Sequence, residues 1–598
     1  MMRIEDYGFI GDMETGALVG VNGSMDWLCM PRFDSAAIFA ALLGDENHGR
    51  WKIAPQDANE ASYSSRQRYW PDTLILETEF TTPAGRARVI DFMPPRGDLP
   101  DVVRIVEGLE GEVAFRSALS IRPGYGKIMP WVRKSNGGIT AIAGPDALHL
   151  SSDVETHGED FNTIAEFSVK PGQRVGFTLQ WHPSHEKPRH HPTPENNLKE
   201  TEDFWHKWCA HSTYEGPWRE QVMRSLITLK ALTYKPTGGV VAALTTSLPE
   251  QIGGVRNWDY RYCWIRDATF TLMGFMGAGY TREAASWRDW LLRAVAGNAA
   301  QMQIMYGVAG ERSLVEMELP WLPGYEKSQP VRTGNAASTQ FQLDVYGELM
   351  DAMHQARLVE INPDPYSWRM QHALLEYLES AWQQPDEGIW EVRGPRQHFT
   401  HSKVMAWVAF DRAVKSIEAF KLEGPLDRWK AQRDALHAEI CAKGYNSKMG
   451  AFTQYYGSDQ LDASLLMLPL VGFLPATDAR VIGTVQAIEK HLCVDGFVLR
   501  YHTDACADGL PEGEGTFLPC SFWLVDNYVL MKRYDDARCL FEKLLTIGSP
   551  LGLFAEEYDP RGKRLLGNYP QAFTHVGLVN SALNLAGVHP PCEERGKC

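Results

Sequence analysis

One segment of the sequence places a glutamate directly after a tryptophan, outside any helical or strand pattern. In QPDEGIWEVRGPRQ, residues 384–397, Glu391 follows Trp390, and the surrounding glycines and prolines are typical of a loop. An apolar wall raises the pKa of a carboxylic acid and keeps it protonated near neutral pH. Glu391 beside Trp390 therefore has the surroundings of a proton donor, and the tryptophan ring could lie against the apolar face of a sugar.

A second acidic segment, GLFAEEYDP at residues 552–560, lies just before the last helical pattern of the chain. It contains Glu556 and Glu557, either of which could face a cavity that the loops share. The positions of Glu391 and Glu556 differ by 165 (556 minus 391), so only the fold could bring them together. Taken alone, each of these acids is more typical of a structural or surface carboxylate.

The segment GVRNWDYRYCWIRDA, residues 254–268, interleaves arginines and aspartates with aromatic residues that include Trp258. Arg266 and Asp267 could together bind neighbouring sugar hydroxyls, because the carboxylate accepts hydrogen bonds and the guanidinium donates several. The same pair could instead tie down the start of a helix, and the residues alone leave both interpretations open.

Charge and composition exclude several classes of protein. The formal net charge is -16 without a basic stripe, which disfavours nucleic acid and anionic lipid as partners. The proline-rich run with His185, His190 and His191 is better explained as a solvated linker than as a metal site. The first residues lack the apolar core of a secretion signal, the longest apolar run is too short for a membrane helix, and ten cysteines occur without CxxC pairs. We therefore expect a cytoplasmic protein without metal or membrane partner; a homo-oligomer is possible.

The pattern of apolar and polar residues changes near residue 185. Before that point, segments such as TLILETEFTT and RVGFTLQW alternate apolar and polar residues between short turns, which predicts an antiparallel β-sandwich. After it, apolar residues recur at helical spacing in eleven segments, with a plausible twelfth near Ala284. Twelve helices joined in series suggest six inner and six outer helices in an (α/α)6 barrel. The predicted fold is α+β with two domains: a sandwich over residues 1–190, a partly helical linker over 191–240, and a helical barrel over 241–598.

Several long motifs, in this order along the chain, resemble those of glycoside hydrolase family 15, the glucoamylase and trehalase family. They are EDYGFIGDMETGALVGVNGSMDWLCMPRFDS, GVRNWDYRYCWIRDA, LPWLPGY, GIWEVRG, HFTHSKVMAWVAFDRA, GTFLPCSFWLVD and GLFAEEYDP. The resemblance covers nearly the whole chain. It implies the same order of β-sandwich, helical linker and (α/α)6 barrel, and an inverting hydrolase that releases one glucose from a non-reducing end.

The resemblance also implies roles for the acids. Glu391 matches the family's general acid, and Glu556 matches its general base. Because AEEYD departs from the family's usual PEQ-like pattern, Glu557 remains a rival for the base. In an inverting glycosidase the two carboxyl groups are roughly 6.5–9.5 Å apart, so that a water molecule fits between the base and the sugar. This chemistry needs no cofactor.

We expect several residues to contact the substrate, on the basis of both the resemblance and the chemistry of their side chains. By resemblance, Arg266 and Asp267 hold the terminal glucose, and Arg393, two residues after the acid, could reach the second sugar or form an exposed salt bridge. The full set of expected contacts is Arg266, Asp267, Trp258, Trp321, Trp390, Arg393, His401 and Lys403.

The sequence favours trehalose as the substrate, because short intracellular members of the resembled family without starch-binding modules look more like trehalases. A glucoamylase-type hydrolase of maltodextrins or isomalto-oligosaccharides remains the alternative. A disaccharide phosphorylase would need a phosphate pocket instead of a second carboxylate. A non-catalytic sugar-binding protein would need neither Glu391 nor Glu556.

Overall fold

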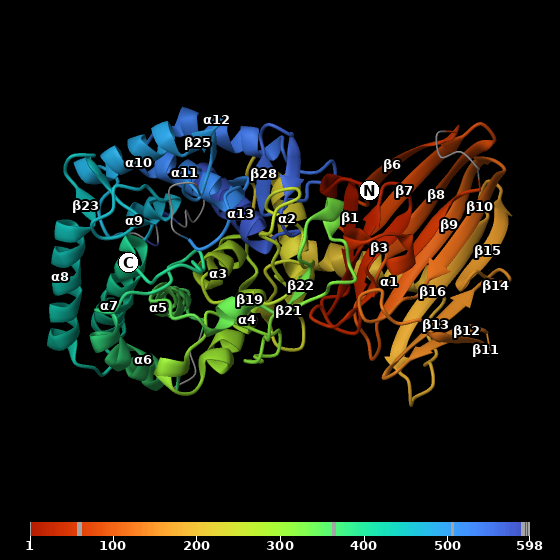
Figure 1. Ribbon diagram of the computed structural model, residues 1–598, viewed down its shortest axis with the longest axis horizontal. Helices are drawn as coiled ribbons and strands as arrows, with labels where there is room; N and C mark the ends of the chain where they lie inside the picture. The colour runs from red at the N-terminus through yellow and green to blue at the C-terminus, as the bar shows by residue number, and fades with distance from the viewer. Residues whose placement is uncertain are drawn as a thin grey trace.

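The computed structural model describes residues 2–56, 62–135, 137–361, 366–503, 508–587, 592, 593 and 595. Figure 1 shows two parts side by side, with the strands of the first 183 residues at one end and the helices of the remaining chain at the other. The helices α1 (Pro194–Cys209) and α2 (Arg219–Ala231) follow the last long strand in the chain. The predicted antiparallel β-sandwich followed by a helical region is confirmed.

The N-terminal part contains two large antiparallel sheets. The first has the order β1-β2-β3-β5-β10-β15-β14, with β4 on β3, and its strands are β1 (Tyr7–Gly11), β2 (Gly16–Gly20), β3 (Ser24–Cys29), β4 (Ala37–Phe39), β5 (Arg50–Pro55), β10 (Val113–Ser120), β14 (His157–Glu159) and β15 (Asn162–Val169). The second has the order β11-β12-β13-β16-β9-β8-β7-β6, and its strands are β6 (Ser64–Tyr69), β7 (Leu76–Thr82), β8 (Gly85–Phe92), β9 (Asp101–Gly111), β11 (Trp131–Ser135), β12 (Gly138–Ala143), β13 (Asp146–Ser152) and β16 (Arg174–Pro183).

Aromatic side chains fill the space between the two sheets. Trp51 on β5 packs edge-on against Phe177 on β16, with ring centroids 6.2 Å apart, and Phe80 on β7 packs in the same way against Phe115 on β10. Such edge-to-face pairs are favourable beyond the apolar area that they bury. The alternation of apolar and polar residues that marked these strands in the sequence therefore corresponds to one face in the core and one toward solvent.

The first three strands depart from this alternation because they are buried on both sides. Every residue of β1, β2 and β3 is buried. The indole nitrogen of Trp27 on β3 donates to the carbonyl of Leu244 at 3.0 Å, and the hydroxyl of Tyr569 donates to the carbonyl of Tyr7 at 2.8 Å. The N-terminal block of the sequence thus forms the junction between the sandwich and the helical region.

The helical region continues with α3 (Ala268–Gly277), α4 (Thr281–Val295), α5 (Asp344–Leu358), α6 (Ser367–Ala381), α7 (Thr400–Phe420), α8 (Leu426–Lys443), α9 (Met467–Leu470), α10 (Ala479–His491), α11 (Leu518–Leu530), α12 (Tyr534–Leu545) and α13 (Ala572–Ala586). Helix α3 packs against α5, α5 against α7, α7 against α9, α9 against α11, α11 against α13, and α13 against α3. These helices are buried on almost every face, whereas α4, α8, α10 and α12 bury one side only. The arrangement explains why apolar residues are so dense in alternate helical segments.

Each helical segment predicted from the sequence overlaps a helix of the structure, but one is much shorter than its pattern suggested. DASLLMLPLVGFL forms a 3-10 turn followed by the four-residue α9, in which Pro469 provides no backbone N–H for a helical hydrogen bond. The predicted boundaries 1–190, 191–240 and 241–598 remain predictions. Within the described part of the chain, no helix combines the length and apolarity that crossing a membrane requires.

Candidate active site

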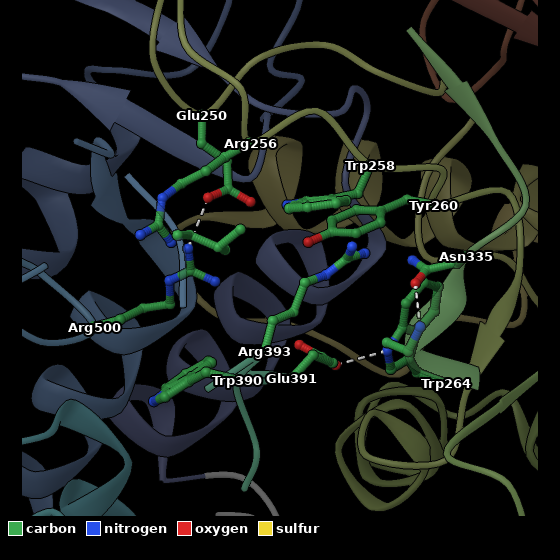
Figure 2. A pocket seen from close by; sticks show the side chains of 12 residues that line it. Glu250, Arg256, Trp258, Tyr260, Trp264, Asn335, Trp390, Glu391, Arg393 and Arg500 are labelled. Carbon is green, nitrogen blue, oxygen red and sulfur yellow. Dashed lines mark hydrogen bonds and ion pairs between the residues drawn. The ribbon is translucent and has the colours of Figure 1, made fainter. Parts of the chain in front are cut away.

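The loops that follow α2, α4, α6 and α10 surround a cavity. Figure 2 shows the side chains that line it, which include Glu250, Arg256, Trp258, Tyr260, Trp264, Asn335, Trp390, Glu391, Arg393 and Arg500. Four of the residues predicted from the sequence, Trp258, Trp390, Glu391 and Arg393, are therefore brought to one cavity. Loops held by rigid helices are where a protein usually carries its reactive groups.

Glu391 lies in the loop between α6 and α7 with a φ of 52°, a left-handed conformation that costs free energy for a side chain other than glycine. Its Oε1 accepts hydrogen bonds from the indole nitrogen of Trp264 and from Nη1 of Arg266, both at 2.9 Å. Among the described residues, none donates a hydrogen bond to the second oxygen, Oε2. That oxygen is therefore able to carry a proton. Burial raises the pKa of Glu391, and the charge of Arg266 opposes this shift.

Arg266 and Asp267 are buried beside this acid. Nε of Arg266 donates to Asp267 at 2.9 Å, and its Nη1 also donates to the carbonyl of Ile389 at 3.2 Å. The guanidinium lies over the ring of Phe573 on α13, 5.2 Å from its centroid. One arginine thus joins the loop that carries Glu391 to the start of α3. The pair precedes α3, but the side chain of Asp267 makes no capping hydrogen bond to this helix, and sugar binding by the pair stays a prediction.

Glu556 and Glu557 are adjacent at the start of a strand. Successive side chains there point to opposite sides, so the two glutamates have different surroundings. Glu557 begins β28 (Glu557–Asp559), which pairs with β27 (Thr516–Phe517), and its Oε2 accepts a hydrogen bond from the backbone of Gly515 at 2.7 Å. The carboxyl of Glu556 lies near Tyr260, a residue that lines the cavity. Burial and then the charge of Glu250 raise the pKa of Glu556 to about 8, while Arg500 and Tyr260 oppose the shift.

Tyr260 lies near both candidate catalytic carboxyls. Burial raises the pKa of its hydroxyl, and the charges of Glu556, Glu250 and Glu391 raise that pKa further. The phenol therefore lies within electrostatic reach of both Glu391 and Glu556. The sequence had contained a signal for this residue, since Trp258, Tyr260 and Trp264 alternate along one extended segment, but the alternation alone did not show which face the cavity occupies.

Arg500 lies at the centre of a carboxylate cluster that sequence analysis missed. It donates to Glu250 at 2.8 Å and to Glu514 at 2.7 Å, and it lies 3.6 Å from Glu557. The three glutamates bring oxygens close enough together to suggest a cation site. The arginine guanidinium already provides the positive charge there, so the cluster is better described as a support for Arg500 than as a metal centre.

Two of the expected substrate contacts that line the cavity, Trp390 and Arg393, also bind neighbouring side chains. Trp390 donates to Asp462 at 2.9 Å and packs against Trp523. The guanidinium of Arg393 lies 4.1 Å from the ring centroid of Trp258 and pairs with Glu316 at 2.8 Å. Arg393 therefore forms the salt bridge that the sequence left as one alternative, and it also lines the cavity.

Three other expected contacts lie apart from the residues that line the cavity. Trp321 donates from its indole nitrogen to the carbonyl of Tyr125 in the sandwich at 2.9 Å. Lys403 is buried on α7 and donates to the carbonyls of Trp382 and Gln384, so its ammonium holds the end of α6. His401 is buried two residues before it, where burial lowers the pKa of the imidazole to about 3. Sugar contacts by these three residues stay predictions.

A cavity lined by the half-buried carboxyl of Glu391 and by Trp258, Trp264 and Trp390 is typical of a glycoside hydrolase. Residues 216–583 match the family model described as glycosyl hydrolases family 15, and residues 1–205 match a trehalase-like N-terminal region. The chain belongs to glycosyl hydrolases family 15, as the sequence motifs had indicated.

Known relatives cover the whole chain. It is 39% identical to a trehalase of Mycolicibacterium smegmatis, with 99% of this chain and 92% of the relative covered. It is 35% identical to a trehalase of Thermoplasma volcanium, with 98% and 93% covered. The crystal structure of a bacterial glucoamylase complexed with acarbose has a similar fold, with a TM-score of 0.73 at 14% identity over 100% of this chain and 96% of that one.

Proposed function

We propose that this protein hydrolyses α,α-trehalose to two glucose molecules with inversion at the attacked carbon. The observation that carries the proposal is that Glu391 and Glu556 both lie within electrostatic reach of Tyr260, which lines the cavity together with Glu391. The trehalases among the relatives support the choice of substrate.

In the proposed mechanism, Glu391 donates the proton on its Oε2 to the glycosidic oxygen while the bond from that oxygen to the anomeric carbon breaks. A water molecule attacks this carbon from the opposite face and gives a proton to ionised Glu556. Arg266 and Trp264 hold the other oxygen of Glu391, so they fix the direction in which the acid points. Arg266 and Asp267 are the proposed partners of the terminal glucose.

The finer architecture is part of the proposal. We infer that α3, α5, α7, α9, α11 and α13 form the inner ring of an (α/α)6 barrel, with α2, α4, α6, α8, α10 and α12 outside. The successive packing of the inner helices, from α3 through α13 and back to α3, supports a closed ring. In such a barrel the loops after outer helices gather at one end, which is where the candidate site lies.

Incubation of the protein with trehalose, maltose and isomaltose, each with and without phosphate, tests the proposed substrate. We expect free glucose from trehalose at the highest kcat/KM and no dependence of the product on phosphate. Preferred cleavage of maltose or isomaltose would favour the glucoamylase-type alternative. Glucose 1-phosphate formed only with phosphate would favour a phosphorylase, and no product from any sugar would contradict a catalytic role.

The pH dependence of kcat/KM follows from the two carboxyls. Glu556 must be ionised to act as the base, so activity falls as the pH drops through its pKa, which burial and Glu250 raise to about 8. Glu391 must be protonated, so activity falls again as the pH rises through its own raised pKa. The acidic limb of the bell-shaped profile follows the lower of the two pKa values and the basic limb the higher, so we expect both limbs above the ordinary glutamate value of 4.5. An acidic limb at that ordinary value, measured over a wide pH range, would contradict the raised pKa values of the two carboxyls.

A further inference from the structure

The segment that lines the cavity with Trp258 and Tyr260 has a second, buried face. Residues alternate in direction along an extended segment, so the side chains of Asp259 and Arg261 point away from the cavity. Nε and Nη2 of Arg261 donate to the two carboxylate oxygens of Asp259 at 2.9 and 2.6 Å. Neither side chain is exposed to solvent, so this is a fully buried, two-point ion pair.

The other donors of Arg261 reach into the N-terminal sandwich. Nη1 donates to the carbonyl of Ser35 and Nη2 to the hydroxyl of Tyr125, each at 2.8 Å. The guanidinium also lies 6.0 Å from the ring centroid of Trp27. These partners come from the N-terminal block and from the loop between β10 and β11, which have no residue among those that line the cavity.

The loop that presents Tyr125 has an unusual backbone. Gly124, Tyr125 and Gly126 have φ values of 66°, 59° and 83°, so three successive residues are left-handed. Glycine adopts this conformation easily, but tyrosine does so at a cost in free energy. The conformation is held by hydrogen bonds from the backbone N–H of Tyr125 to the carbonyl of Ala37 and from Trp321 to the carbonyl of Tyr125. Strain that the surrounding structure retains in this way is often found where a side chain must be placed accurately.

Asp259 also binds a second segment that forms a wall of the cavity. Its Oδ2 also accepts a hydrogen bond from the backbone N–H of Gly334 at 3.1 Å, and its carbonyl accepts one from the side chain of Asn335 at 3.4 Å. Asn335 lines the cavity opposite the loop of Glu250 in Figure 2. A single buried carboxylate therefore joins two wall segments that are far apart in the sequence.

We propose that Tyr125, Arg261 and Asp259 form a buried junction through which the N-terminal sandwich positions two walls of the reaction cavity. The sandwich is then a part of the active unit, although it contributes no group that touches the reacting atoms. Arg261 and Asp259 are positioning residues. The kinetic part of this inference rests on the proposed hydrolase function, because a displaced wall lowers turnover only if the cavity is where the reaction occurs.

Tyr125→Phe tests the junction with little risk to folding, because only the hydroxyl that accepts from Arg261 is lost. We expect kcat/KM on trehalose to fall by about ten-fold, since small displacements of a site are costly to turnover. Asp259→Asn, which weakens both the ion pair and the bond to Gly334, should lower it by about a hundred-fold. Asp91→Asn is the matched control, because Asp91 pairs with Arg104 at 2.6 Å in an equally buried ion pair within the sandwich core. It should lower the melting temperature and leave kcat and KM unchanged.

Hydrogen exchange at the Gly334 amide provides a readout that needs no substrate. We expect faster exchange at Gly334 in the full-length Tyr125→Phe and Asp259→Asn variants, and unchanged exchange there in Asp91→Asn. Wild-type kinetics and wild-type exchange in Tyr125→Phe would overturn the junction, as would equal kinetic losses in the Asp91→Asn control. If the wild-type protein does not cleave trehalose, the proposed function fails, and the exchange measurement still decides the inference.

Discussion

Glu391→Gln is expected to lower kcat on trehalose by about a thousand-fold or more, with a much smaller change in KM. Glutamine keeps an oxygen that can accept the hydrogen bonds from Trp264 and Arg266, so the loop should retain its shape. It has no acidic proton for the departing sugar, which would then leave as an unprotonated alkoxide. Steady-state kinetics on the purified variant measure both constants, and full activity would overturn the assignment of the acid.

The nature of the leaving group sharpens this test. Fluoride departs without a proton, so α-glucosyl fluoride should remain a substrate for Glu391→Gln while trehalose does not. Glu387→Gln is a suitable control from the same loop, because Glu387 forms an ion pair with Arg396 at 2.8 Å instead of facing the cavity. We expect the control to retain most of its activity on both substrates. Equal losses on trehalose and the fluoride in Glu391→Gln would indicate a damaged site instead of a missing acid.

The sequence predicted those features that depend on local pattern. Period-two alternation located the sandwich, and helical periodicity located the helices, because both arise from burying one face of a regular element. Glu391 could be predicted because its tryptophan and its loop are neighbours in the sequence. Motif resemblance then supplied the candidate partner, Glu556, which no local pattern could have connected to it.

The features that the sequence did not predict depend on contacts between distant segments. Arg500 reaches the cavity only because Glu250, Glu514 and Glu557 surround it, and these four residues come from three separate loops. Lys403 lies in a motif typical of the family, yet its ammonium binds carbonyls at the end of α6. The N-terminal block was recognised as a family motif without a reason for its composition, and its burial between the two parts of the protein provides one.

The choice between Glu556 and Glu557 as the base leads to a second large expected effect. Glu556→Gln should lower kcat by about a thousand-fold on trehalose and equally on α-glucosyl fluoride, since both reactions need an activated water. Glu557→Gln should have a much smaller effect on kcat, because glutamine can still accept from the amide of Gly515 and Glu557 faces Arg500 instead of Tyr260. Inactivity of Glu557→Gln alone, with an active Glu556→Gln, would reverse the assignment.

The stereochemistry of the products tests the same base from another direction. Attack by water on the face opposite the breaking bond inverts one anomeric carbon of trehalose, so one glucose should appear as the β-anomer and the other should keep its α-configuration. Proton NMR during the first minutes, before the anomers equilibrate, would resolve the two signals. Two α-anomers would mean a covalent intermediate and a carboxylate acting as nucleophile. Glu556 would then have to contact the sugar itself, and its place near Tyr260 could no longer be explained as support for a water-activating base.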